Sequence, residues 1–209
     1  MEKGFFITLE GCEGSGKSTQ LKKLEEYFIK SGKSFVFTRE PGGTPISEDI
    51  RKIILDGKNV EMTDQTEALL YASSRAQHIT EKILPAKNQG KIVICDRYID
   101  SSFAYQAYAR GLGMDFIQGV NVFAIQNCMP DLTLFFDISP EDAFRRKGGA
   151  DKDDRLEQSG LEFHKKVYAG YKQLAQDYPQ RISVIDATKT ADEVFESVLE
   201  ILRKREIVE

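Results

Sequence analysis

The sequence has few cysteines, no long apolar run and no excess of positive charge. Three cysteines among 209 residues, odd in number and without metal-ligand spacing, predict reduced thiols in a cytoplasmic protein. No apolar run approaches the roughly 18 residues of a membrane-spanning helix, and the N-terminus lacks the apolar core of a signal peptide. The net charge of −4 provides no broad basic surface for nucleic acid or for an anionic membrane. We therefore expect neither partner, and local basic clusters must serve small anions.

The chain alternates short apolar segments with amphipathic ones. A helix is expected over Asp64–Lys87, with its core stripe at Leu69, Ala72, Ala76, Ile79 and Ile83. Two further helices, broken around Gly111–Gly113, are expected before Met129. The apolar segments expected as β-strands are Phe5–Leu9, Ser34–Thr38, Lys91–Cys95, Leu132–Ile138 and Arg181–Asp186. This alternation predicts an α/β fold, a five-stranded parallel sheet with helices on both faces, in one domain over residues 1–209.

The segment with the clearest chemistry follows the first predicted strand. It reads Gly11-Cys12-Glu13-Gly14-Ser15-Gly16-Lys17-Ser18, with Thr19 next, and fits the phosphate-binding pattern G-x-x-x-x-G-K-[ST] at every fixed position. Glycines turn the backbone N–H groups toward phosphate oxygens, and the helix that follows points its N-terminus at the same place. Lys17 is suited to the β- and γ-phosphates of a nucleoside triphosphate, and the Ser18 hydroxyl to Mg²⁺.

Other polar residues follow strands that end at the same edge of the sheet. Asp96 ends a buried strand, where an acid can hold Mg²⁺ through water, and it can also cap the next helix. Arg39 and Arg97 follow strands directly, and a guanidinium fork suits a phosphate dianion. A second phosphate-bearing ligand is therefore expected, which favours a kinase whose acceptor is already phosphorylated.

A planar base would complete such an acceptor. Tyr71 and Arg75 lie four residues apart on one helical face, as a stacking plane and a hydrogen-bond donor or as a surface pair. Ser102, Tyr105 and Gln106 follow the Asp96-Arg97-Tyr98 turn and offer further polar contacts. Residues 145–155 carry many charges and two glycines without an apolar face, which indicates a solvated surface loop or a mobile lid over the nucleotide.

Several motifs together resemble the bacterial thymidylate kinases over nearly the whole chain. They are Glu10-Gly11-Cys12-Glu13-Gly14-Ser15-Gly16-Lys17-Ser18-Thr19, Thr38-Arg39-Glu40-Pro41-Gly42-Gly43-Thr44, Tyr71-Ala72-Ser73-Ser74-Arg75, Asp96-Arg97-Tyr98-Ile99-Asp100-Ser101-Ser102-Phe103-Ala104-Tyr105-Gln106, Pro130-Asp131-Leu132-Thr133 and Asp154-Arg155-Leu156-Glu157. The resemblance implies a P-loop kinase fold with a lid at about 145–156. It also implies transfer of the γ-phosphoryl group of ATP to dTMP for dTTP biosynthesis, with Mg²⁺ and a homodimer.

The same resemblance implies roles for single residues. Arg39 and Arg97 would hold the dTMP phosphate, and Tyr71 would stack on thymine. Arg75 would donate to thymine O4, and Gln106, supported by Arg51, would read the base edge. Glu13 would face the 3′-hydroxyl and the metal, Tyr105 would crowd the 2′ position, and the Glu40–Pro41 bond is expected to be cis.

The source of the catalytic cation depends on the phosphate loop. Family members without arginine in that loop take it from the lid, so the resemblance implies Arg146 as first choice and Arg155 as second. The alternatives are a kinase for a deoxynucleoside or another nucleotide, and a P-loop switch or ATP-dependent regulator. A nucleoside kinase would use Glu13 or Asp96 as a base, but it would leave Arg39 and Arg97 with little to bind. A nucleotide-dependent switch lacks support, because the chain has no Asn-Lys-x-Asp motif.

Overall fold

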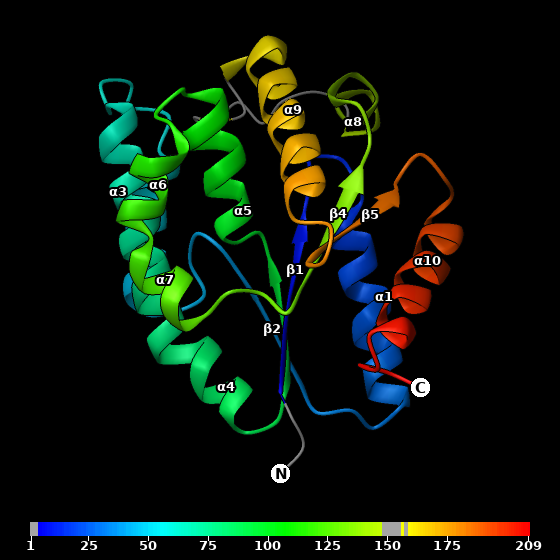
Figure 1. The fold of residues 1–209 in the computed structure, drawn as a ribbon. Coiled ribbons are helices and arrows are strands. Elements are labelled where there is room, and N and C mark those ends of the chain that lie inside the picture. Colours follow the sequence, from blue (N-terminus) through cyan, green and yellow to red (C-terminus); the bar gives the residue numbers. More distant parts are fainter. Residues whose placement is uncertain (1–3, 148–155, 157–158) are drawn as a thin grey trace.

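The structure is a computed structural model that describes residues 4–147, 156 and 159–209. Its centre is a sheet of five parallel strands in the order β2-β3-β1-β4-β5 (Figure 1). The strands are β1 (Phe5–Glu10), β2 (Phe35–Arg39), β3 (Ile92–Asp96), β4 (Leu132–Asp137) and β5 (Ile182–Asp186). All five predicted strands are confirmed within about one residue, and so is the α/β fold class.

Helices cover both faces of the sheet. Figure 1 shows α1 and α10 on one side, with α3 and α5 on the other. The buried side chains form two hydrophobic clusters. Phe6 of β1 belongs to one and Ile7 to the other, because successive side chains of a strand point to opposite faces of the sheet. No helix within the described residues is both long and apolar enough to cross a membrane.

Most of the helical segments that follow the strands are short. They are α1 (Lys17–Lys30), α2 (Pro45–Leu55), α3 (Asp64–His78), η1 (Ile79–Ile83), α4 (Leu84–Asn88), α5 (Ile99–Ser102), η2 (Phe103–Ala109), α6 (Met114–Val120), α7 (Val122–Asn127), α8 (Pro140–Lys147), α9 (Leu161–Asp177) and α10 (Ala191–Lys204). The segments η1 and η2 are π-helical, a geometry that is frequent at functional sites. The predicted break at Gly111–Gly113 separates η2 from α6, and a second break at Asn121 was not expected.

The predicted core stripe of the long helix is wrong in its first half. Leu69 is 49% exposed, and Ala72 and Ala76 are only partly buried. The buried face carries Glu67 and Arg75 instead, because polar partners from other elements surround them. Ile79 and Ile83 are fully buried as predicted.

The predicted lid does not begin in a loop. Arg145, Arg146 and Lys147 belong to α8, whose first turn is capped by Ser139, with the Asp142 N–H donating to Ser139 Oγ at 3.1 Å. Residues 148–155 lie outside the described part of the chain, so the remainder of the lid stays a prediction.

Candidate active site

The phosphate loop joins β1 to α1 in the geometry that its glycines allow. Gly11, Gly14 and Gly16 have φ values of 139°, 80° and 94°, which disfavour other residues. A Cβ on Gly11 would also lie 2.8 Å from the Phe136 carbonyl oxygen. Lys17 is buried, and its Nζ donates to the carbonyl oxygens of Gly11 and Cys12 at 3.1 and 3.0 Å. Burial, and then the Arg97 charge, lower the lysine pKa.

A hollow of about 710 Å³ opens beside this loop. It is lined by Glu13, Gly14, Gly16, Lys17, Ser18, Thr19, Asp96 and Arg146. Burial raises the pKa of the Cys12 thiol in this loop to about 11, which disfavours the reactive thiolate.

Asp96 fits the predicted metal role. Its Oδ1 is buried, and within the described residues it has no hydrogen-bond partner. Asp96 and Ser18 line the same hollow, and hydroxyl and carboxylate oxygens suit Mg²⁺. In the part of the chain that the structure describes, no three His, Cys, Asp or Glu side chains form a metal-binding group. A cation here would therefore depend on nucleotide oxygens as well as on these two residues.

Arg97 lies where the site residues converge. It follows β3 with a φ of 65°, a conformation that costs energy in a residue with a side chain and often marks a functional position. Its NH2 group donates to Glu13 Oε1 at 2.6 Å, and its NH1 group donates to Tyr171 Oη at 3.3 Å and Ser101 Oγ at 3.4 Å. The guanidinium also lies over the Tyr105 ring at 5.3 Å.

A buried carboxylate supports Arg97 from below. Glu10 ends β1, and its Oε2 accepts from Ser101 Oγ at 2.6 Å and from Tyr171 Oη at 2.7 Å, the two hydroxyls that Arg97 contacts. Burial, followed by the charge of Asp100, raises the pKa of Glu10 to about 7. Arg97 is therefore held through a network of residues from β1, α5 and α9.

The two predicted phosphate-binding arginines share a second hollow of about 590 Å³ with Arg51, which is predicted to support Gln106. Arg39, Arg51 and Arg97 line it, together with Glu13 and Asp96. Arg39 is half-exposed and pairs with Glu48 at 2.8 Å, and the Arg51 NH1 group donates to the Pro41 carbonyl oxygen at 2.8 Å. Three guanidinium groups therefore face this hollow, together with the carboxylates of Glu13, Glu40 and Asp96.

A third, adjoining cavity of about 480 Å³ contains the predicted base-binding residues. Its lining includes Tyr71, Arg75, Arg97, Ser102, Tyr105 and Gln106, with Leu156 from the end of the predicted lid and His164 from α9. Tyr71 and Arg75 are therefore not a solvated surface pair. Arg75 is 1% exposed, which leaves its guanidinium almost entirely to protein partners and to the cavity.

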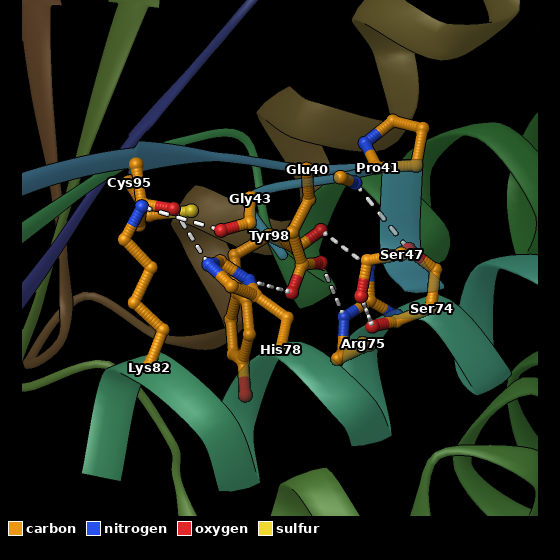
Figure 2. Close-up of polar contacts among 12 residues, drawn as sticks. Glu40, Pro41, Gly43, Ser47, Ser74, Arg75, His78, Lys82, Cys95 and Tyr98 are labelled. Atoms are coloured by element: carbon orange, nitrogen blue, oxygen red, sulfur yellow. Dashed lines mark hydrogen bonds and ion pairs between the residues drawn. The ribbon is translucent and has the colours of Figure 1, made fainter. Parts of the chain in front are cut away.

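Figure 2 shows how Arg75 is held. Its Nε donates to Glu40 Oε2 at 2.8 Å, and Glu40 Oε1 lies 3.0 Å from His78 Nδ1. Arg75 NH1 also donates to Asn121 Oδ1 at 2.6 Å and to Ser102 Oγ at 2.9 Å. All these partners are buried. The Glu40–Pro41 bond is cis, as expected.

Comparisons with known proteins decide the family. The thymidylate kinase family model matches residues 9–198. The chain belongs to the thymidylate kinase family. The thymidylate kinase of Clostridium novyi (strain NT) is 52% identical over 205 residues, which cover 97% of this chain and 100% of that protein. The thymidylate kinase of Finegoldia magna is 49% identical over 203 residues, with 97% and 100% covered. A crystal structure of thymidylate kinase from Ehrlichia chaffeensis has a TM-score of 0.77 at 33% identity, covering 96% of this chain and 98% of that one.

The thymidylate kinase site also contains residues that sequence reasoning missed. Gln106 Nε2 donates to Glu67 Oε1 at 2.8 Å, a partner that was not predicted from the sequence, and the support of Gln106 by Arg51 stays a prediction. Glu67 is fully buried and pairs with Arg110 at 3.1 Å. A signal for it was present, because Glu67, Tyr71 and Arg75 repeat every four residues and share one helical face.

The two candidates for the catalytic cation differ in what the structure describes. Arg146 donates through NH1 to the Ala187 carbonyl oxygen at 2.6 Å and through NH2 to that of Thr188 at 2.8 Å. It therefore contacts the segment after β5 while lining the hollow of the phosphate loop. Arg155 lies outside the described residues.

Proposed function

We propose that this thymidylate kinase transfers the γ-phosphoryl group of ATP to dTMP, producing ADP and dTDP in dTTP biosynthesis. One observation supports the proposal best. Glu13 lines the phosphate-loop hollow, the arginine-lined hollow and the base cavity, so a donor and an acceptor phosphate would meet beside it. Asp96 likewise borders the first two hollows.

The transfer needs alignment and charge neutralisation rather than a base. The attacking group is a phosphate oxygen that is already ionised at neutral pH. Lys17 would bind the donor phosphates, and Arg39 and Arg97 would hold the acceptor phosphate in line with them. Mg²⁺, when bound, would neutralise charge on the β- and γ-phosphate oxygens, and Ser18 and Asp96 are the residues that fit it.

The acceptor base and sugar would occupy the adjoining cavity. Tyr71 would stack on thymine, while Arg75 and Gln106 would bind its polar edge, with Ser102 beside them. Glu13 would face the 3′-hydroxyl, and Tyr105 would crowd the 2′ position against ribonucleotides. A water-excluding lid at 145–156 would supply the transition-state arginine, Arg146 first and Arg155 second.

A coupled assay for ADP tests the substrate assignment. ATP and Mg²⁺ are supplied with dTMP, UMP, CMP, AMP, GMP or thymidine in turn. The proposal predicts that dTMP has the highest kcat/KM. Turnover of thymidine or UMP without turnover of dTMP would contradict it.

We further propose that the protein is a cytoplasmic homodimer. Exposed apolar side chains lie on α3, α6 and α7, which pack against one another, namely Leu69, Phe116, Val122 and Phe123. A second copy would remove them from water. Light scattering after size exclusion should give twice the chain mass of 23.6 kDa. Leu69→Glu should shift the protein to the monomer, and a monomeric wild type would contradict the proposal.

The cytoplasmic location is proposed from the cysteines. All three are free and buried, which suits a reducing compartment.

A further inference from the structure

A buried carboxylate on α3 contacts the residue that reads the base. Glu67 is fully buried, and its Oε1 accepts a hydrogen bond from Gln106 Nε2 at 2.8 Å. Its Oε2 accepts from Arg110 NH2 at 3.1 Å. The Arg110 guanidinium, a permanent cation, compensates the buried negative charge of Glu67.

The chemistry of this pair fixes how the Gln106 side chain is turned. A carboxamide has a donor end and an acceptor end, and either can face a ligand. A carboxylate only accepts, so the NH2 group of Gln106 must face Glu67. Because Gln106 also lines the base cavity, the remaining end that it can offer there is the acceptor oxygen Oε1.

The cavity then presents a defined pattern to a pyrimidine. Gln106 provides an acceptor, and the Arg75 guanidinium, which lines the same cavity, provides a donor, because one NH2 hydrogen remains beside its bonds to Glu40, Ser102, Asn121 and Tyr98 among the described residues. Thymine and uracil have N3–H and the O4 acceptor, which match this pattern. Cytosine has a bare N3 and a 4-amino group, so both of its contacts would be mismatched and would leave buried polar groups unpaired.

We propose that Glu67 is a specificity-determining positioning residue, which excludes cytosine nucleotides by holding the Gln106 amide in one orientation. The inference rests on the proposed function, since the base must be a pyrimidine bound in this cavity. Glu67 does not touch the substrate and acts through Gln106. It should therefore govern which bases are accepted without affecting the donor nucleotide.

The test compares Glu67→Gln with a matched control. Glu81→Gln removes the carboxylate from a bond of the same kind, in which Gln77 Nε2 donates to Glu81 Oε2 at 2.8 Å on the exposed side of the same helical run. The kcat/KM values are measured for dTMP, dUMP and dCMP. In Glu67→Gln the Gln106 carboxamide can rotate and present its NH2 group to the cavity. The ratio of kcat/KM for dTMP to that for dCMP should therefore fall at least about tenfold.

Two further measurements, the preference for dTMP over dUMP and the KM for ATP, separate positioning from a general loss of structure. The preference for dTMP over dUMP should not change in Glu67→Gln, because the two bases have the same N3–H and O4 edge. The KM for ATP should also stay the same, and Glu81→Gln should behave as wild type. An unchanged ratio of dTMP to dCMP in Glu67→Gln, or an equal rise in KM for ATP and dTMP, would overturn the proposal.

The exchanged pair covers the case in which Glu67→Gln does not fold. The double variant Glu67→Gln with Gln106→Glu keeps one amide, one carboxylate and an acceptor oxygen at the cavity. It should still prefer dTMP to dCMP, and loss of that preference would overturn the inference. A wild-type enzyme that phosphorylates no pyrimidine nucleotide would instead refute the proposed function, so the two failures are distinct.

Discussion

Replacing Glu40 by alanine should destabilise the fold by about 3–5 kcal/mol, because the change leaves a buried guanidinium without its carboxylate. Arg75 and Glu40 are 1% and 4% exposed, and their contact is 2.8 Å long. The remaining Arg75 partners, Ser102, Asn121 and the Tyr98 carbonyl, are neutral. They cannot replace the lost charge. The loss would take a large part of the roughly 5–15 kcal/mol of a typical domain.

Urea unfolding followed by circular dichroism measures this loss. Glu200→Ala is the matched control, since Glu200 pairs with Lys204 on the surface at 2.7 Å and both side chains are mostly exposed. Its midpoint should move far less than that of Glu40→Ala. An unchanged m-value would show that both variants unfold from comparable native states.

A double-mutant cycle identifies the cause of the loss. When Arg75→Met accompanies Glu40→Ala, neither charge remains buried. The free energy of unfolding lost in the double variant should therefore be about 2 kcal/mol smaller than the sum of the two single losses. A loss below about 1 kcal/mol in Glu40→Ala, or strictly additive losses, would refute the reasoning.

Three other predictions concern separate parts of the molecule. The Glu10 pKa is raised to about 7, so the native state binds its proton more tightly, and the stability that this supplies is lost as pH rises through 7. The free energy of unfolding of Glu10→Gln, measured relative to that of wild type in urea titrations, should therefore rise by about 2–3 kcal/mol from pH 5 to pH 8. The same difference between variant and wild type at both pH values would contradict this. A Cβ at Gly170 would lie 3.2 Å from Ala104 Cα, whereas one at Gly119 meets nothing within 4 Å. Gly170→Ala should lower the thermal midpoint and Gly119→Ala should raise it, because only the second gains helix propensity without crowding, and the opposite order would be wrong for this packing. Removing the transition-state arginine should lower kcat on the order of 10³-fold with little change in the KM for dTMP, and comparing Arg146→Ala with Arg155→Ala in a single-turnover assay should identify it.

Local patterns in the sequence predict the sheet and the phosphate loop. Each strand is a short apolar run with its own flanking turn, and Gly11 to Ser18 needs only neighbouring residues to form its cradle. The positions of Arg39, Asp96 and Arg97 followed from the rule that parallel strands end at one edge. The pattern that identifies each of these features is local, although the sheet itself pairs distant residues such as Phe5 and Ile92.

The residues that hold the site arginines in place could not be predicted, because their contacts join parts of the chain that are far apart in the sequence. Glu10 and Tyr171 are 161 residues apart in the chain, yet they share a hydrogen bond of 2.7 Å beneath Arg97. The sequence predicts a core stripe at Leu69 because apolar side chains are usually buried. In the structure α3 buries the face that carries Glu67 and Arg75 instead, because Arg110 and Glu40 compensate their charges.

Transfer of a labelled phosphoryl group tests the central claim most directly. With ATP labelled in its γ-phosphate, Mg²⁺ and dTMP, the label should appear in the β-phosphate of dTDP in a one-to-one ratio with ADP. Label released chiefly as inorganic phosphate, or ATP left intact in the presence of dTMP, would contradict the direct transfer that the adjoining hollows at Glu13 support.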